Sequence, residues 1–314
     1  MRRKLEVMEI TIIALFLLAI EHGTNALTGT RWSYRDNNGP EKWPELFPNM
    51  CAGLYQSPID IPPIDTVYNQ QLTNFVFYDQ LARGAKFIAD NNGKSIEVDT
   101  QGQFLLAYGG LQYTYRISQF HFHWGGSNDK GSEHTINEEA TPMEMHIVTW
   151  NVDKYSSIAE AAMEQDGLAV LGILFSVSHY DNPLLEPLVK VMPYIKDPEW
   201  NNSVEIPVVS PSAFLPNSPE KYYRYHGSLT TPRCYESVTW TVFKERQTIS
   251  EKQLNVFRQV LMSRATMEVP GSHSLQSTGR IFGEEREPLV NNFRPVQPLN
   301  GRVVKRSYQI LHAE

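Results

Sequence analysis

The chain has 314 residues, of which 41% are hydrophobic, 11% aromatic and 20% charged, and its formal net charge is −7. This composition is typical of an ordinary globular protein with ample material for a core. The negative balance and the lack of a basic run argue against a polyanion-binding surface, so nucleic acid is not an expected partner. Length allows one or two domains, but no repeat, low-complexity segment or Gly/Ser linker divides the chain. We therefore predict one domain.

The N-terminal segment predicts a secretory signal peptide over residues 1–26. A basic start is followed by an apolar run from Ile10 to Ile20 and by small residues before a cleavage point after Ala26. The alternative is an uncleaved membrane anchor, but the run is shorter than the ~20 residues that span a bilayer. The C-terminus lacks the apolar tail of a GPI anchor. The mature chain, residues 27–314, is expected to be extracellular, with no membrane span.

The sequence contains two cysteines, Cys51 and Cys234. In a secreted protein such a pair predicts a disulfide, and the alternative is two buried free thiols. The bridge would close a loop of about 180 residues. For a loop of this length the chain-entropy model gives a stabilisation of about 5 kcal/mol. The single sequon, Asn201-Asn202-Ser203, makes Asn201 a candidate glycosylation site on the surface.

The predicted elements are mostly short strands. After a loop-like segment over Leu27–Gln56, strands are expected at Phe75–Tyr78, Ala85–Ile88, Ser95–Val98, Phe104–Tyr108, Leu111–Tyr115, Gln119–Gly125, Met143–Trp150, Leu168–Val177, Ser237–Lys244 and Val303–Leu311. Hairpin turns are expected at Asn91-Asn92-Gly93 and Gly109-Gly110. Helices are expected at Ser156–Gln165, Pro183–Tyr194 and from a capping box at Ser250 to Leu261. The pattern predicts an α+β fold, a single domain built on a large, mostly antiparallel twisted central β-sheet with a few short peripheral helices.

Large aromatic and polar residues alternate over Gln119–Gly125, the period-two pattern of a strand. Side chains two apart share a face, so His121 and His123 project together, with Gln119 behind them as a candidate partner of His121. Two imidazoles at this spacing can both reach one Zn²⁺, which takes three or four ligands. The alternative is a polar face beside an aromatic core. A zinc site requires a third ligand.

The predicted strand Met143–Trp150 supplies a third candidate ligand, His146. Alternation places Glu144 on the same face, where its carboxylate can accept the second N–H of this imidazole. Three histidines leave one tetrahedral position open, which is typical of a catalytic zinc, and two cysteines are too few for a thiolate site. Histidines satisfied within the core are the alternative.

Two further stretches carry polar groups. Glu133 and His134 lie in the loop between the two histidine strands and are candidate members of a buried hydrogen-bond network. The hydroxyl pair of Gly227–Pro232, taken alone, indicates only a turn between Gly and Pro.

Four motifs, in this order, resemble those of the α-class carbonic anhydrases: Gln56-Ser57-Pro58-Ile59-Asp60, Gln119–Gly125, Glu144-Met145-His146 and Ser228-Leu229-Thr230-Thr231-Pro232. The similarity continues through Asn292-Phe293-Arg294-Pro295 and Gln297-Pro298 and covers nearly the whole mature chain from about Trp32. Secreted and membrane-bound members carry a disulfide matching Cys51 and Cys234. The resemblance implies reversible hydration of CO₂ to bicarbonate and a proton, with Zn²⁺ as the cofactor. It implies no particular protein partner.

The resemblance also implies roles for individual residues. His121, His123 and His146 would bind zinc, with a water or hydroxide at the fourth position whose pKa falls from about 15.7 to about 7. Thr230 matches the threonine that accepts a hydrogen bond from this hydroxide and donates one to the glutamate matching Glu133.

Substrate-binding and supporting residues follow in the same way. The backbone N–H of Thr230, together with Thr231, would hold bicarbonate. An apolar wall for CO₂ would consist of Val148, Val170, Leu229 and Trp240. Gln119, Glu144 and Asn292 would support the metal ligands from behind.

The proton channel is where the chain departs from the family. Fast members carry a histidine after Asn-Asn-Gly that shuttles protons from the zinc site to solvent, but here Lys94 occupies that position. A lysine with an ordinary pKa of about 10.4 is a poor relay at pH 7, where a group near 6.5 is well matched. Tyr34 and Asn92 match residues that order water in the channel. Glu97 stands where an amide is common.

Two other classes of protein are compatible with the resemblance. An acatalytic carbonic-anhydrase-like binding module typically lacks a zinc ligand, whereas this chain keeps all three histidines as well as Thr230 and Glu133. A matrix or biomineral protein would be favoured by acidic or Gly-Asn repeats, and the sequence contains none. The enzyme is therefore the leading hypothesis.

Overall fold

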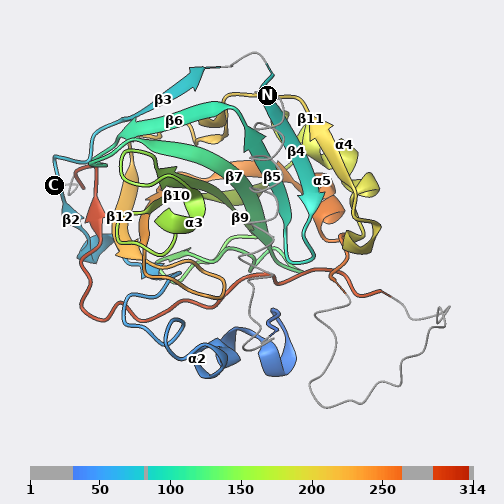
Figure 1. Ribbon diagram of the computed structural model, residues 1–314, viewed down its shortest axis with the longest axis horizontal. Coiled ribbons are helices and arrows are strands. Elements are labelled where there is room, and N and C mark those ends of the chain that lie inside the picture. Colours follow the sequence, from blue (N-terminus) through green and yellow to red (C-terminus); the bar gives the residue numbers. More distant parts are fainter. Residues whose placement is uncertain (1–30, 81–83, 264–285, 311–314) are drawn as a thin grey trace.

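A twisted sheet of 13 strands forms the centre of the protein in the computed structural model, which describes residues 31–80, 84–263 and 286–310 (Figure 1). The main path of neighbouring strands is β11 (Ser203–Ile206), β4 (Lys86–Asn91), β5 (Ile96–Gln101), β7 (Tyr115–Trp124), β9 (Met143–Asn151), β10 (Leu168–Ser178), β13 (Val238–Phe243), β12 (Tyr222–Gly227), β15 (Lys305–Arg306) and β2 (Val67–Tyr68). Off this path, β3 (Phe75–Gln80) pairs with β6 (Gln103–Tyr108), β6 also pairs with β7, and β14 (Gln247–Ser250) pairs with β10. A separate two-stranded sheet joins β1 (Asp60–Ile61) to β8 (Thr135–Ile136).

Most pairings in the large sheet are antiparallel. The exceptions are β10 with β13, β10 with β14, and β15 with β2. Antiparallel ladders suit a chain of short strands joined by tight turns, as at Asn91-Asn92-Gly93, where β4 and β5 form the predicted hairpin. The prediction of one α+β domain on a large, mostly antiparallel sheet is confirmed.

The helices are short and lie at the periphery of the sheet (Figure 1). The α-helices are α2 (Trp43–Leu46), α3 (Ile158–Ala161), α4 (Glu186–Val191) and α5 (Glu251–Phe257). The 3₁₀ turns are Asp36–Asn38, Pro40–Lys42, Pro63–Asp65, Met192–Tyr194, Pro198–Trp200 and Pro211–Phe214. The predicted capping box is present, because Ser250 Oγ accepts the N–H of Gln253 while the Gln253 side chain accepts the N–H of Ser250.

Some predicted boundaries are wrong. Residues 111–114 form a loop rather than the start of a strand, because Gly109 and Gly110 both have positive φ and Asp153 accepts the N–H of Thr114. The strand predicted at Val303–Leu311 is reduced to β15, and its last residue lies outside the described ranges.

The helices are also shorter than predicted. The segment predicted at Ser156–Gln165 is helical only over α3, and α5 ends at Phe257 rather than Leu261. Strands β11, β12 and β14 are absent from the prediction, because β11 and β14 have only four residues each and the residues of β12 do not alternate between apolar and polar. The predicted signal peptide lies outside the described residues.

Two apolar clusters occupy opposite faces of the sheet. The larger includes Phe120, Phe122 and Trp124 of β7 and is covered in part by Leu254 and Phe257 of α5. The second contains Val148, Val170, Val238, Trp240, Tyr223 and Tyr225. Because β-strand side chains alternate, His121 and His123 face away from the larger cluster.

A β-bulge in β7 determines which residues share these faces. The register against β9 shifts between Ile117 and Gln119. Ile117 therefore packs in the same apolar cluster as Phe120, three residues later, although regular alternation would put them on opposite faces. The predicted alternation holds from Gln119 onward.

The N-terminal part of the described chain is held by the disulfide Cys51–Cys234, which is present as expected. Trp32 and Trp43 pack beside this bridge with a ring-centroid distance of 5.2 Å, and Tyr34 contacts both rings. The bridge ties this segment to the loop that follows Thr231. Within the ranges described, no helix is long and apolar enough to cross a membrane.

Candidate metal centre

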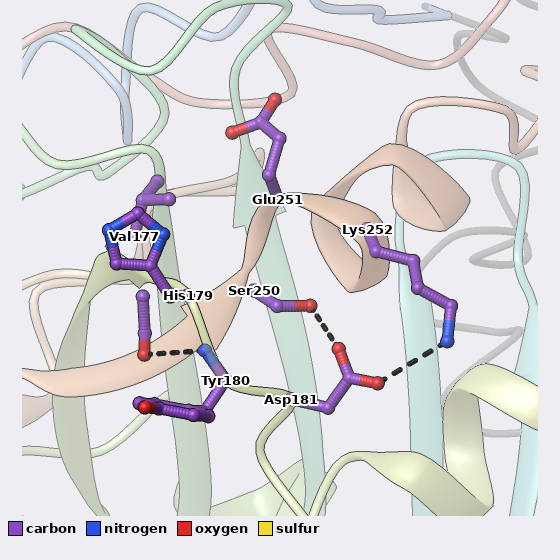
Figure 2. Close-up of a pocket in the computed structure, with 8 residues that line it drawn as sticks. Val177, His179, Tyr180, Asp181, Ser250, Glu251 and Lys252 are labelled. Atoms are coloured by element: carbon purple, nitrogen blue, oxygen red, sulfur yellow. Dashed lines mark hydrogen bonds and ion pairs between the residues drawn. The ribbon is translucent and has the colours of Figure 1, made fainter.

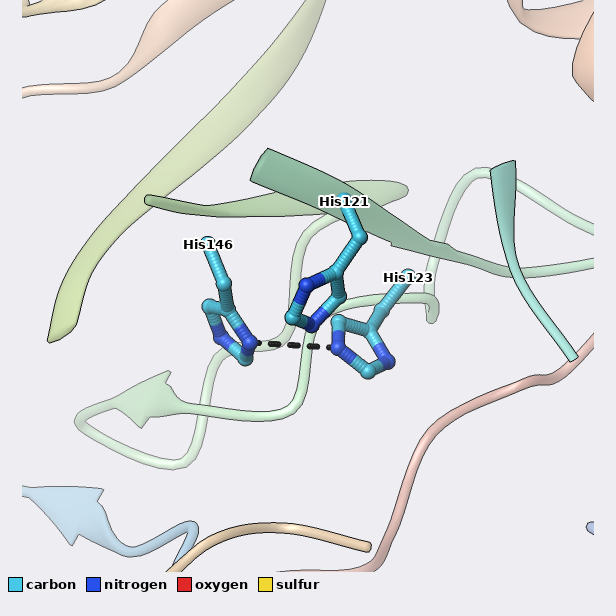
Figure 3. Close-up of side chains that lie close together, drawn as sticks. All are labelled: His121, His123 and His146. Carbon is cyan, nitrogen blue, oxygen red and sulfur yellow. Dashed lines mark hydrogen bonds between the residues drawn. The ribbon is translucent and has the colours of Figure 1, made fainter. Parts of the chain in front are cut away.

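Three histidines from two neighbouring strands converge on one face of the sheet (Figure 3). His121 and His123 project from β7, and His146 projects from β9 directly opposite His121 in the ladder. Their ring centroids are 4.6–5.2 Å apart. One nitrogen from each ring lies within 4.8 Å of the other two. The structure thus brings together the three candidate ligands that the sequence indicates.

Each imidazole has one nitrogen engaged on the outside of the group. His121 Nδ1 lies 2.9 Å from Gln119 Oε1, and His123 Nδ1 lies 2.7 Å from the carbonyl oxygen of Asn292. His146 Nε2 lies 2.7 Å from Glu144 Oε1. These three partners present oxygen acceptors, so the engaged nitrogens carry the protons. The remaining nitrogens, His121 Nε2, His123 Nε2 and His146 Nδ1, carry lone pairs.

Two of these lone pairs face each other, and this geometry fits a cation. His123 Nε2 and His146 Nδ1 are 3.1 Å apart (Figure 3). With both protons on the outer nitrogens, no hydrogen joins this pair, and the lone pairs repel unless a positive charge lies between them. The spacing is close to the about 3.3 Å expected between two ligands of a tetrahedral zinc with Zn–N bonds of about 2.05 Å. Three neutral imidazoles are a donor set that Zn²⁺ prefers.

The electrostatic surroundings keep the imidazoles of His121 and His123 neutral. Burial, reinforced by the neighbouring rings, holds the pKa of His121 well below its ordinary value. Burial and His146 lower the pKa of His123 to about 3. Neutral imidazole is the form that binds metal, so these shifts favour coordination at neutral pH.

Glu144 connects His146 to a buried polar chain. Burial opposes ionisation of Glu144, but His134 and His146 outweigh it, and its pKa lies well below the ordinary value. Glu144 Oε1 accepts from His134 Nδ1 at 2.7 Å, and His134 Nε2 lies 2.7 Å from the Tyr225 hydroxyl. The Tyr225 hydroxyl donates in turn to Ser57 Oγ. His134, a candidate network member from sequence, occupies this chain.

The position of the Glu144 carboxylate in this hydrogen-bond network requires a glycine on the next strand. Gly172 of β10 lies opposite His146, and a Cβ added there would be only 2.9 Å from Glu144 Oε1. A larger residue would displace the carboxylate that supports His146. Because the strand around it is an unbroken apolar run, no local pattern indicates this requirement.

A second carboxylate, that of Glu133, lies beside the histidines. Its Oε1 accepts the backbone N–H of Arg294 at 2.8 Å, and its Oε2 is 3.5 Å from His123 Nε2. Oε2 is buried and lacks a well-formed hydrogen bond among the described residues. Burial raises the pKa of Glu133 to about 7, against the opposing effects of His146, the Thr230 hydroxyl and the Arg294 N–H. Thr230 itself is buried.

An apolar wall stands next to His146. Val148, Val170 and Trp240 are opposite one another across β9, β10 and β13, and Leu229 packs against the same cluster. The Trp240 ring is 4.8 Å from the His146 ring, and its Nε1 donates to the carbonyl oxygen of Ser228. The four residues expected to line an apolar pocket are therefore adjacent, and Thr231 lies partly exposed beyond Thr230.

The four residues expected in a proton channel, Lys94, Tyr34, Asn92 and Glu97, have different partners in the structure. Asn92 Oδ1 accepts the N–H groups of Lys94 and Ser95 and so closes the turn. Tyr34 packs on Trp32. Glu97 instead contacts a residue behind the histidines, since its Oε2 accepts from Gln119 Nε2 at 3.1 Å.

Asn292 and Arg294 have more contacts than the sequence indicates. The Asn292 side chain accepts the N–H of Trp124 and donates to the carbonyl oxygens of Lys94 and Phe122. The buried guanidinium of Arg294 donates to Gln56 Oε1 and to the Ser57 and Cys51 carbonyl oxygens. These long-range contacts hold the C-terminal segment against the site, and no local pattern could have predicted them.

A hollow of about 700 Å³ lies elsewhere, between the end of β10 and the start of α5 (Figure 2). Its lining residues are Val177, Ser178, His179, Tyr180, Asp181, Ser250, Glu251 and Lys252. Asp181 is hydrogen-bonded to Ser250 and paired with Lys252. None of the predicted site residues borders this hollow.

Comparison with known proteins agrees with this geometry. A family model described as eukaryotic-type carbonic anhydrase matches residues 38–308. Carbonic anhydrase 7 from Mus musculus and from Homo sapiens are each 36% identical over 281 residues, which cover 88% of this chain and 97% of each relative. Carbonic anhydrase 1 from Mus musculus is 37% identical over 280 residues, covering 88% of this chain and 98% of that protein. The chain belongs to the α-class, eukaryotic-type carbonic anhydrase family.

Proposed function

We propose that this carbonic anhydrase is an extracellular zinc enzyme that converts CO₂ and water reversibly to bicarbonate and a proton. The observation that carries the proposal is the convergence of one nitrogen from each of His121, His123 and His146, while the other nitrogen of each ring lies beside an oxygen acceptor. When bound there, zinc supplies a Lewis acid that lowers the pKa of a coordinated water to about 7.

Thr230 and Glu133 orient the attacking oxygen in this proposal. Glu133 Oε1 already accepts a hydrogen bond from the Arg294 N–H. Oε2 therefore remains to accept a hydrogen bond from the Thr230 hydroxyl. A threonine that donates to a carboxylate can only accept from the nucleophile. This directs the lone pair of the nucleophile at the substrate carbon and rejects groups that cannot donate a hydrogen bond.

The substrate lies against the apolar wall in the same proposal. CO₂ is uncharged, so Val148, Val170, Leu229 and Trp240 can hold it without a polar partner. Bicarbonate is polar, and the N–H of Thr230 together with Thr231 provides its contacts. The apolar wall offers bicarbonate no hydrogen bond, so the wall that binds the substrate does not hold the product.

We propose that proton release limits turnover when the buffer concentration is low. Lys94 replaces the shuttle histidine, and its ammonium lies over the Trp32 ring. An ammonium has no lone pair with which to accept a proton, and its attraction to the ring restrains it from moving between the site and solvent.

We also propose secretion of residues 27–314 after cleavage of the signal peptide. The Cys51–Cys234 disulfide supports an oxidising compartment. Asn201 is exposed in a left-handed conformation at the end of a 3₁₀ turn, so its side chain is accessible for glycosylation.

Metal content and CO₂ hydration test the function. The wild-type chain should contain one zinc and hydrate CO₂ in a stopped-flow indicator assay, and His121→Ala should lose most of both. Stoichiometric zinc without hydration would overturn the proposal in favour of an acatalytic binding module. Full activity in a zinc-free preparation would contradict it as well.

A further inference from the structure

A carboxylate, an amide and an imidazole form a line across β5 and β7. Glu97 lies opposite His121 in this ladder. Its Oε2 accepts from Gln119 Nε2 at 3.1 Å, and Gln119 Oε1 accepts from His121 Nδ1 at 2.9 Å. Gln119 is only 6% exposed, so water competes little for either bond.

The carboxylate determines which end of the amide faces the histidine. An ionised carboxylate only accepts hydrogen bonds, so it binds Gln119 through Nε2 and repels Oε1. A half-turn of the amide would bring two oxygens together at Glu97. The amide oxygen must therefore face His121 and requires a proton on Nδ1. This leaves the lone pair of His121 on Nε2, within the histidine group.

We propose that Glu97 is a positioning residue that sets the tautomer of His121 through Gln119 and strengthens it as a metal ligand. The proposal rests on the proposed zinc function and adds to it the residue that prepares one ligand. A carboxylate that accepts from an amide N–H increases the electron density on the amide oxygen, because linked hydrogen bonds polarise one another. A stronger acceptor at Nδ1–H makes the other imidazole nitrogen a better donor to metal.

Asp99 offers a matched control. It lies two residues from Glu97 on the same face of β5 and is opposite Gln119 in the ladder. Among the hydrogen bonds of the described chain, none joins its side chain to Gln119. Asp99→Asn removes the same negative charge as Glu97→Gln from the same face but leaves the line to His121 intact.

The test compares zinc-loaded full-length variants. Zinc release into excess dipicolinate should be about 10-fold faster in Glu97→Gln than in wild type, because a glutamine there accepts either end of the Gln119 amide. The proton resonance of His121 Nδ1–H should move upfield and exchange faster with solvent. Asp99→Asn should stay within about two-fold of wild type in release rate, with the resonance unmoved.

A double variant separates the line from a general change in the site. In a Gln119→Ala background, Glu97→Gln should produce no further acceleration of zinc release, because the connecting amide is gone. Equal acceleration with and without Gln119 would overturn the proposal, as would equal effects of Glu97→Gln and Asp99→Asn. In either case a zinc-loaded, active wild type leaves the proposed function standing. A wild type that holds no zinc overturns the proposed function itself.

Discussion

Lys94 Nζ lies 4.1 Å from the centroid of the Trp32 ring. A cation over the face of an indole is attracted by the ring electrons, and tryptophan is the strongest partner of this kind. The backbone of Lys94 is fixed as well, since its carbonyl oxygen accepts from Asn292 Nδ2 at 3.0 Å. Asn292 also accepts from His123 through its own carbonyl oxygen. One residue thus connects the lysine turn to the metal centre.

Proton transfer should limit turnover when buffer is dilute. Adding imidazole is expected to raise the maximal CO₂ hydration rate of the wild type severalfold, because imidazole titrates near pH 7 and can carry the proton that Lys94 does not. Lys94→His should be faster than wild type in dilute buffer and should respond less to imidazole. Stopped-flow rates across a buffer series check this, and equal responses of the two proteins would contradict it.

Loss of the Thr230 hydroxyl should reduce catalysis without loss of metal. Thr230→Ala is expected to lower kcat/KM for CO₂ hydration by about 100-fold, the usual effect of removing one oriented hydrogen-bonding group from a site. Zinc content should stay at one per chain, since Thr230 is not among the grouped nitrogen ligands. Thr239→Ala, on the opposite face of β13 from Trp240, is the control and should keep wild-type activity. A Thr230→Ala enzyme as fast as this control would remove Thr230 from the mechanism.

Asp99 should destabilise the fold at neutral pH. Burial raises its pKa to about 6, above the ordinary value of about 3.9 in an unfolded chain. The folded state therefore binds the proton more tightly, and stability is expected to fall as pH rises from about 4 to about 6.

Asp99→Asn removes the buried charge and should stabilise the protein by about 1–2 kcal/mol at pH 7.5, after allowance for partial exposure, and by almost nothing at pH 4. Urea unfolding at the two pH values measures the difference. An equal gain at both would mean that the effect is not ionisation of Asp99.

Removing the disulfide should cost stability and loosen the loop after Thr231. The double variant Cys51→Ser, Cys234→Ser is expected to lose about 2–5 kcal/mol of unfolding free energy. Because the bridge ties this loop to the N-terminal segment, hydrogen exchange should also accelerate around Thr231 while β9 stays protected. Unchanged denaturation midpoints in the variant and the wild type would show that packing of Trp32 and Trp43 alone holds the segment.

Local pattern predicts the centre of the sheet and the three histidines well. Alternation over Gln119–Gly125 and Met143–Trp150 places the side chains on the correct faces, because one set of alternate residues in each strand packs in the larger apolar cluster. The Ser250 capping box is likewise a local signal and is present. The roles expected of Thr230 and Glu133 come from the resemblance to a family and not from strand alternation.

Contacts between distant segments could not be predicted from pattern. Arg294 reaches Gln56 across more than half of the chain, and Gly172 is required only because Glu144 occupies the space above it. The resemblance places Glu97 in a proton channel, but its hydrogen bond to Gln119 points to a role behind the ligands. These relationships depend on which strands become neighbours, which the sequence specifies only through the complete fold.

The bulge between Ile117 and Gln119 makes β7 intolerant of small changes in length. Upstream of it the strand places Tyr115 and Ile117 in the large apolar cluster, and downstream Phe120 and Phe122 do the same. Deleting one residue there would leave a regular strand in which only one half could keep its apolar side chains inward. The other half would either expose its core residues or turn both β7 histidines into the core. Natural variants of this chain should therefore vary in loop length around β7 but never by a single residue within it.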